Sequence, residues 1–145
     1  MRSKALNESG ERTFALIFET GDEALSGITR FAEEHSLAAS RFTAIGAFSS
    51  AVLGYFDWEK KDYERICIDE QVEAVSLIGD IALDAGKPKV HAHVVLGLRD
   101  GQTRGGHLLE ARVRPTLEVV LTESPTYLKR EFNRDSGLAL IRIGS

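Results

Sequence analysis

The chain has 145 residues, a length typical of one domain with its own hydrophobic core, and it is 43% hydrophobic and 28% charged, an ordinary globular composition. Its 22 acidic residues outnumber its 18 basic ones, and the resulting net charge of −4 argues against a free-standing nucleic-acid-binding protein. The single cysteine, Cys67, cannot form an internal disulfide or a thiolate zinc site, so any metal would need His, Asp or Glu ligands.

We expect neither a secretory signal nor a membrane span. The N-terminal MRSKALNESGER is polar, and the longest stretch without a charged residue, 42–56, is diluted by Gly, Ser and Thr. This stretch is shorter than the ~20 apolar residues that cross a bilayer. We therefore expect a cytoplasmic protein with no membrane partner, and the lone cysteine fits a reducing compartment.

The first predicted elements are a strand and a helix. After a polar arm over residues 1–12, residues 13–20 are rich in the β-branched and aromatic residues typical of strands. Gly21 ends this strand. Asp22 can cap a helix that continues to about Ser36, because apolar side chains recur there at helical spacing.

The rest of the chain is predicted to form strands. Residues 42–56 are apolar or small on both alternating faces, which predicts a strand covered on both sides by the helix, another sheet or a neighbouring subunit. Further strands are expected at residues 63–69, 72–83, 89–98, 107–113, 116–122 and 138–143. One helix and about eight or nine strands predict a single α+β domain over the whole chain, built mainly from antiparallel sheet.

Three of the four histidines, His91, His93 and His107, lie close together in the sequence. His91 and His93 share one face of their predicted strand, whereas the aliphatic residues around them form the other face. We expect the aliphatic face to be the core, so both imidazoles point toward solvent, a cleft or a subunit boundary. A His-x-His pair alone is most often a solvated strand face.

The connection between the two histidine-bearing strands decides whether His107 joins the pair. A two-residue turn would place His107 opposite Val94, on the wrong face, whereas a three-residue loop with Gly101 in the left-handed conformation would place it opposite His93. A bulge at residues 105–106 would achieve the same correction. With that register the three imidazoles could hold zinc or another divalent transition metal, with the fourth position open.

Other polar residues nearby have two interpretations each. Glu118 lies in an apolar run and needs a partner, either a histidine that it would orient toward a metal or an arginine. Arg104, Gly105 and Gly106 could contact an anion, but they lack the strand-to-helix context of a phosphate loop, so we favour a bulge. Cys67, between two isoleucines, is expected to be buried filler rather than a nucleophile.

Several motifs together resemble the plants-and-prokaryotes-conserved (PPC) domain. Residues 86–120 carry HAHVVLGLRDG followed by GGHLLEARVRPTLEVV, and the AIGA and VSLIGD segments at 44–47 and 75–80 occur in the family's order. The resemblance covers about residues 13–143. It implies an α+β fold with a large antiparallel sheet, a homotrimer and, as in several prokaryotic members, a metal site that maps onto the three histidines.

The same resemblance implies an association with DNA. In land plants the domain follows AT-hooks in nuclear regulators and recruits partners, and single-domain bacterial relatives are commonly named as DNA-binding by analogy. This sequence contains no hook. The plant partner-recruiting segment Gly-Arg-Phe-Glu-Ile-Leu corresponds to residues 70–75, where only Glu73 matches.

Two functions are compatible with these features. The leading interpretation is a non-catalytic trimeric assembly or regulatory module, whose histidine site stabilises the fold or binds a small ligand and which meets DNA weakly or through a partner. The alternative is an enzyme in which a three-histidine metal activates water against a small substrate at the subunit boundary. In that case Glu118 or Glu110 would transfer protons.

Overall fold

The computed structural model describes residues 1–7 and 10–143, with side chains described at residue 1 and from residue 10 onward. These residues form nine strands and one helix, α1 (Ala24–Glu34). The strands are β1 (Arg2–Asn7), β2 (Arg12–Glu19), β3 (Ala39–Asp57), β4 (Asp62–Ile68), β5 (Val72–Asp84), β6 (Lys87–Gly97), β7 (Thr103–Glu123), β8 (Lys129–Asn133) and β9 (Leu138–Arg142). The prediction of one mainly antiparallel domain is confirmed at this level, although its helix is short.

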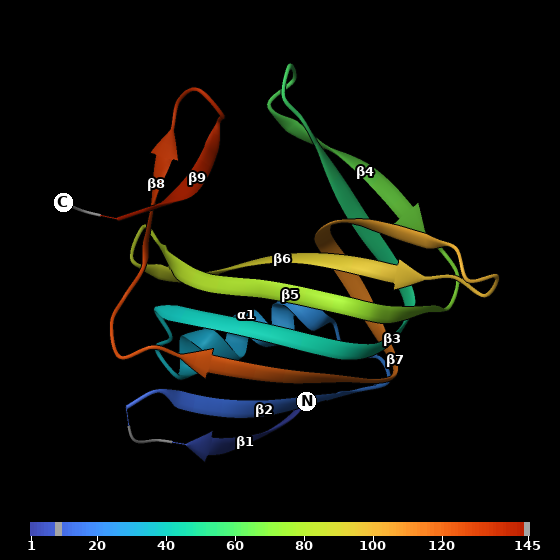
Figure 1. Cartoon of the computed structure of the whole chain (residues 1–145), viewed down its shortest axis with the longest axis horizontal. Helices are drawn as coiled ribbons and strands as arrows, with labels where there is room; N and C mark the ends of the chain where they lie inside the picture. The colour runs from blue at the N-terminus through green and yellow to red at the C-terminus, as the bar shows by residue number, and fades with distance from the viewer. Residues whose placement is uncertain (8–9, 144–145) are drawn as a thin grey trace.

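All nine strands belong to one sheet, which partly closes on itself. Its main path is β1-β2-β7-β3-β5-β8-β9, with every pairing antiparallel except that of β5 with β8. Because β6 pairs with both β5 and β7, the strands β3, β5, β6 and β7 form a closed circuit. Figure 1 shows α1 lying against one face of the sheet, and the β3–β4 and β8–β9 hairpins projecting on the same side of the molecule.

The helix begins at Ala24, one residue later than a cap at Asp22 predicts. Glu23 is the N-cap, and its carboxylate accepts hydrogen bonds from two backbone N–H groups of the first turn. Asp22 is unavailable for this role because its carboxylate accepts a hydrogen bond from the Glu19 N–H and pairs with the N-terminal amine. The prediction that Asp22 caps the helix is therefore wrong, and the helix has 11 residues rather than the predicted range 22–36.

One long strand, β7, replaces the two strands predicted at 107–113 and 116–122. Pro115 separates those predictions in the sequence, yet it lies where the β3–β7 register shifts, between the pairs formed by Val113 and Leu117. At that position its missing N–H costs no β3–β7 hydrogen bond among the described residues. Opposite this shift lies Gly46, where a Cβ atom would be 2.3 Å from the Thr116 carbonyl oxygen.

Two strands occur where none was predicted. Residues 2–7, expected to be part of a polar arm, pair with β2, and residues 129–133 pair with β9. Neither segment shows a clear apolar alternation in the sequence, so the pairing with a neighbouring strand has no local signal. Residues of β8 and β9 line a cavity together with His91 and His107, so their hairpin reaches the histidine region.

The core follows the predicted division of β6. Ala92, Val94 and Leu96 are buried, as expected for the aliphatic face.

The prediction that Cys67 is buried is wrong, because it is exposed on β4, whose described pairing is with β3 alone. The helix of the described residues is too short and too polar to cross a membrane.

The sheet face opposite α1 carries exposed apolar side chains from β3, β5, β6 and β7. We call this set the outer face: Ile45, Val75, Ile78, Val95 and Val120. Ile45 is 61% exposed, although residues 42–56 were predicted to be covered on both sides. The chain itself therefore covers only one side of this part of β3, and the other side is free to contact another molecule.

Candidate metal centre

The loop between β6 and β7 brings the three histidines together. Of the connections considered from the sequence, it has the three-residue loop, with Gly101 at φ 83° and the Leu98 N–H donating to the Gln102 carbonyl. The resulting register pairs His93 with His107. The β6–β7 register has no shift over residues 103–107, so the alternative bulge at residues 105–106 is not used.

The three imidazoles are spaced as ligands of one ion would be. His91, His93 and His107 each offer a nitrogen, and these atoms lie within 4.8 Å of one another. The Nε2 atoms of His91 and His93 are 3.2 Å apart. Two nitrogens bound to one tetrahedral zinc at ~2.0–2.1 Å lie about 3.3 Å apart, so this pair already has the required separation.

The protonation state of the clustered histidines also suits metal binding. The pKa of His107 is lowered to about 4, chiefly by burial and in addition by the charges of the two neighbouring imidazoles. Burial and the charge of His91 likewise lower the pKa of His93. Both side chains are therefore neutral at pH 7, which is the form of histidine that binds metal ions.

One buried atom of the cluster lacks a hydrogen-bond partner. Nδ1 of His107 is inaccessible to solvent and has no partner among the described residues. A buried polar atom left in this state costs free energy. Three imidazole nitrogens within 4.8 Å of one another, on residues of which one ring has an unpartnered buried nitrogen, fit a bound cation.

A carboxylate from the adjacent strand orients the first histidine. Asp80 lies opposite His91 in the β5–β6 register, and its Oδ2 is 3.6 Å from His91 Nδ1. Its other oxygen accepts a hydrogen bond from the Arg130 guanidinium of β8. Burial alone would raise the pKa of Asp80, but His91 and Arg130 outweigh it, so the pKa is lowered. Because Nδ1 of His91 faces this carboxylate, Nε2 is directed to the cluster, as in carboxylate–histidine–metal sites.

Asp80 and Arg130 were not among the candidates chosen from sequence. Asp80 can be found from the turn between β5 and β6. Ala85 and Gly86, with positive φ values of 49° and 80°, form a two-residue turn that fixes the register of these strands. Counting back from that turn places Asp80 opposite His91. Arg130 has no such local signal, because β8 reaches the site only through the fold.

The glutamates proposed from sequence lie elsewhere. Glu118 is exposed on β7 opposite Ile45 and belongs to the side of the sheet that carries the outer face. Glu110 precedes Glu118 on β7, and its carboxylate lies 3.7 Å from Arg112 Nε. The carboxylate that the structure places against a cluster histidine is that of Asp80.

Arg104, Gly105 and Gly106 are regular residues of β7 rather than an anion-cradling loop. A Cβ atom at Gly105 would lie 3.1 Å from the Val94 carbonyl oxygen, and one at Gly106 would lie 3.0 Å from the Gly54 carbonyl oxygen. The glycines therefore allow β7 to pass closely between β6 and β3. This close passage helps to bring His107 to the cluster.

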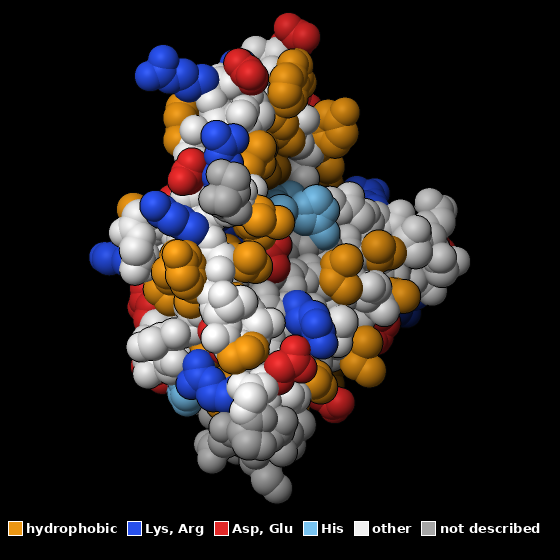
Figure 2. All heavy atoms as spheres, turned by 60° about the vertical axis from the view of Figure 1, so that its left-hand side comes forward, with side chains coloured by type: hydrophobic (Ala, Val, Ile, Leu, Met, Phe, Trp, Pro, Cys, Tyr) orange, Lys and Arg blue, Asp and Glu red, His pale blue; other side chains and the backbone are white. Residues whose placement is uncertain are grey.

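Two hollows adjoin the histidines. The first, which we call the hairpin cavity, has a volume of about 160 Å³ and is lined by Tyr63, Lys89, Val90, His91, His107, Arg130, Leu138, Ala139 and Leu140. Within it the Tyr63 ring stacks on His107, with ring centroids 4.5 Å apart. The second hollow is lined by Ile78, Gly79, Asp80, His91 and His93 and leads to the outer face. Figure 2 shows histidine side chains reaching the surface beside hydrophobic side chains.

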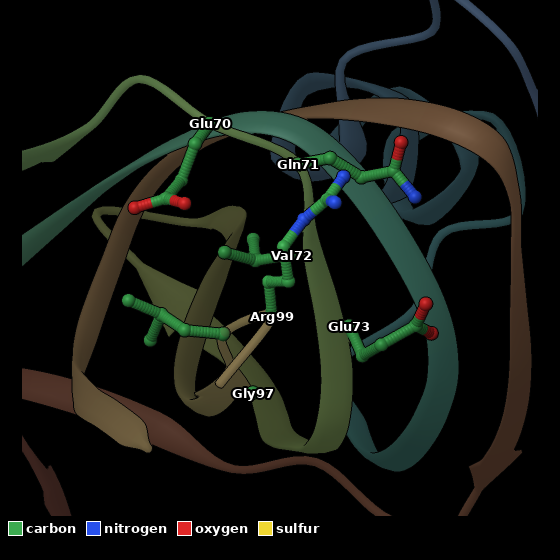
Figure 3. A pocket seen from close by; sticks show the side chains of 7 residues that line it. Glu70, Gln71, Val72, Glu73, Gly97 and Arg99 are labelled. Atoms are coloured by element: carbon green, nitrogen blue, oxygen red, sulfur yellow. The ribbon is translucent and has the colours of Figure 1, made fainter. Parts of the chain in front are cut away.

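The segment that corresponds to the plant recruiting motif lines a separate pocket. Glu70, Gln71, Val72 and Glu73 enclose about 270 Å³ together with residues 97–99. Figure 3 shows the Glu70 and Glu73 carboxylates directed away from each other, with the Arg99 side chain extending across the pocket. This pocket shares no lining residue with the two hollows beside the histidines.

Fold and site define a small, mainly antiparallel domain with a three-histidine cluster suited to a metal ion. The family model of the Plants and Prokaryotes Conserved (PCC) domain matches residues 5–125. The chain belongs to this family, which is the PPC family that the sequence motifs resemble.

Similar solved structures agree in fold. The chain is 38% identical to a metal-containing protein from Archaeoglobus fulgidus, with TM-score 0.83 and coverage of 90% of this chain and 93% of that one. A PPC protein from Pyrococcus horikoshii is 32% identical, with TM-score 0.86 and coverage of 99% and 96%. A Ralstonia eutropha protein named for a presumed role in DNA binding is 26% identical, with TM-score 0.85 and coverage of 90% and 91%.

A curated relative contains a similar segment within a longer chain. The bifunctional protein GlmU of Synechococcus is 30% identical over 128 residues, which make up 87% of this chain. The match covers 19% of that protein, so this chain spans about a fifth of its relative's length.

Proposed function

We propose that the chain is a non-catalytic, self-associating regulatory module that holds one divalent transition metal ion, preferably zinc, at His91, His93 and His107. The observation that carries this proposal is the convergence of three imidazole nitrogens within 4.8 Å of one another. The metal-containing protein from Archaeoglobus fulgidus, at 38% identity, supports it independently.

The role proposed for the metal is structural. His91 and His93 come from β6 and His107 comes from β7, so an ion shared by them cross-links two strands of the closed circuit. Zinc bound in this way contributes its binding free energy to folding, and it supplies a Lewis acid where its fourth position is open. Asp80 holds His91 in the orientation that this requires.

We further propose that a second copy of the chain covers the outer face and that three copies form a homotrimer. Ile45, Val75 and Ile78 are 61%, 57% and 55% exposed, a degree of exposure that favours burial against another apolar surface. Ile78 also lies opposite His93 in the β5–β6 register. Assembly through this face would therefore border the metal site.

A role connected with DNA is supported by the Ralstonia eutropha relative and opposed, for direct contact, by the net charge of −4. An acidic chain gains little free energy from releasing the counterions of DNA. We therefore propose that any DNA association is weak or passes through a partner protein.

The alternative function is a metal-dependent enzyme, and the hairpin cavity beside the cluster is the observation that favours it. An enzyme of this kind needs a carboxylate that is free to exchange protons near the open position of the metal. Asp80 is engaged by both Arg130 and His91, which suits a residue that holds a ligand in place. This engagement favours the non-catalytic module.

Metal analysis of the purified protein tests the proposal. We expect one metal ion per chain in the wild type and none in His107→Ala, with circular dichroism showing that the variant still folds. His35→Gln is the matched control, because His35 ends α1 and stacks on Phe31 away from the cluster. Unchanged stoichiometric metal in His107→Ala would remove the assignment of His107 as a ligand.

A further inference from the structure

The hairpin cavity lies between the histidine cluster and the β8–β9 hairpin. Its basic side chains are Lys89 and Arg130, and its apolar walls come from Val90, Leu138 and Leu140. We propose that this cavity binds a small carboxylate, held between Arg130 and the metal ion. The inference rests on the proposed function, because it requires a metal at the histidines.

Arg130 provides the first reason. It is buried, at 7% exposure, and its Nη1 donates a hydrogen bond to the Ala139 carbonyl while its Nη2 donates to Asp80. Its Nε is buried and has no partner among the described residues. A buried guanidinium N–H without an acceptor is costly, and an oxygen of a carboxylate is the acceptor that it binds most strongly.

The balance of charge provides the second reason. Asp80 pairs with Arg130, and the Asp84 carboxylate lies 2.9 Å from Lys89 Nζ, so the cavity is close to neutral without a metal. Three neutral imidazoles do not cancel the charge of a divalent ion. The loaded site is therefore positive and attracts an anion, whereas the metal-free site does not.

The size and walls of the cavity select the kind of anion. Its volume of about 160 Å³ is small beside the pockets of drug-sized ligands and equals the share of liquid occupied by roughly five water molecules. Val90, Leu138 and Leu140 can pack against a short aliphatic tail. A phosphate would leave oxygens unpaired against these walls, so a short-chain carboxylate fits better.

Calorimetric titration of zinc-loaded protein tests the proposal, after metal analysis has established one ion per chain. Propionate is the probe, and its uncharged analogue propionamide and inorganic phosphate are the comparisons. We expect one propionate per chain, with both comparison compounds binding at least about tenfold more weakly, as does propionate with metal-free protein. This factor corresponds to the loss of one charge-assisted hydrogen bond.

A substitution that fills the cavity checks the location. Ala139→Leu should weaken propionate binding at least about tenfold while one zinc per chain is retained, because the added atoms occupy the ligand's space. Ile141→Leu, on the same strand but outside the lining, should leave the affinity unchanged.

The possible failures are distinguishable. Zinc-loaded wild-type protein that does not bind propionate, or that binds phosphate more tightly, would overturn this inference and leave the metal site standing. Unchanged binding in Ala139→Leu would also overturn it. Wild-type protein that binds no metal would overturn the proposed function and this inference together.

Discussion

Asp80 completes the histidine cluster because it settles which nitrogen of His91 is free. An imidazole on a strand can present either nitrogen, and a carboxylate that faces Nδ1 leaves Nε2 to the metal. The Arg130 guanidinium in turn holds Asp80 in its ionised form. A histidine cluster predicted from sequence therefore depends on two residues that lie outside the histidine motif.

Asp80→Asn should weaken zinc binding by roughly 10- to 100-fold, because the amide no longer provides the charged acceptor that orients His91. Competition with a chromophoric chelator measures this affinity. The matched control is Asp84→Asn on the same strand, whose carboxylate pairs with the exposed Lys89 instead of a histidine. Equal zinc affinities for Asp80→Asn and the wild type would show that Asp80 does not orient the ligand.

At the scale of elements, the closed circuit depends on the close approach of β3 and β7. Gly46 lies at a register shift between these strands, with φ 154°, where a Cβ atom would be 2.3 Å from the Thr116 carbonyl oxygen. Gly101, in the β6–β7 loop, has φ 83° but no atom within 4 Å of the position of a Cβ. Gly46 thus combines a close steric contact with an unfavourable φ, whereas Gly101 has the unfavourable φ alone.

Gly46→Ala should lower the free energy of unfolding by roughly 2 kcal/mol or more, because two strands must move apart. Gly101→Ala should cost only about 1 kcal/mol, the typical penalty of a left-handed conformation for a residue with a Cβ. Urea denaturation measures both values. Equal losses would mean that the β3–β7 contact relaxes easily and does not fix the separation of these two strands.

Local rules predicted the elements whose register is set within a short stretch of chain. The three-residue loop at Gly101 is one of two connections that the sequence offers for placing His107 opposite His93, and the structure has that loop. The Asp22 cap failed because its carboxylate is engaged by the N-terminal amine, a contact that no local pattern indicates. Arg130 was not predicted for the same reason, since its contact with Asp80 depends on how β8 packs beside β5.

For the whole molecule, the exposed apolar side chains of the outer face favour self-association. Its apolar side chains come from four strands of one sheet and are half exposed or nearly so in the single chain. A surface of this kind favours association with a complementary copy. Because Ile78 of this face lies opposite His93, the proposed assembly would border the histidine site.

Ile45→Lys should convert the trimer into monomers of 15.9 kDa, since burying an ammonium group in an apolar interface is strongly unfavourable. Sedimentation velocity distinguishes the two states. The control is Phe132→Lys, which alters a residue 70% exposed on the projecting β8 and should leave the trimer intact. A wild-type protein that sediments as a monomer would contradict the assembly.

Binding of this chain to duplex DNA should be weak and should fall steeply between about 50 and 200 mM salt. The physical reason is the net charge of −4, which offers little counterion release. Fluorescence anisotropy with a labelled duplex measures the affinity at each salt concentration. Tight, sequence-selective binding at physiological salt by the chain alone would show that direct DNA recognition had been underestimated.

Anomalous diffraction shows whether His91, His93 and His107 hold one metal ion. Data collected on both sides of the zinc absorption edge, from crystals of zinc-loaded protein, locate the ion independently of any assumption about its ligands. We expect one peak per chain, ~2.0–2.1 Å from a nitrogen of each of the three imidazoles. A zinc peak at other residues, with none among these histidines, would contradict it.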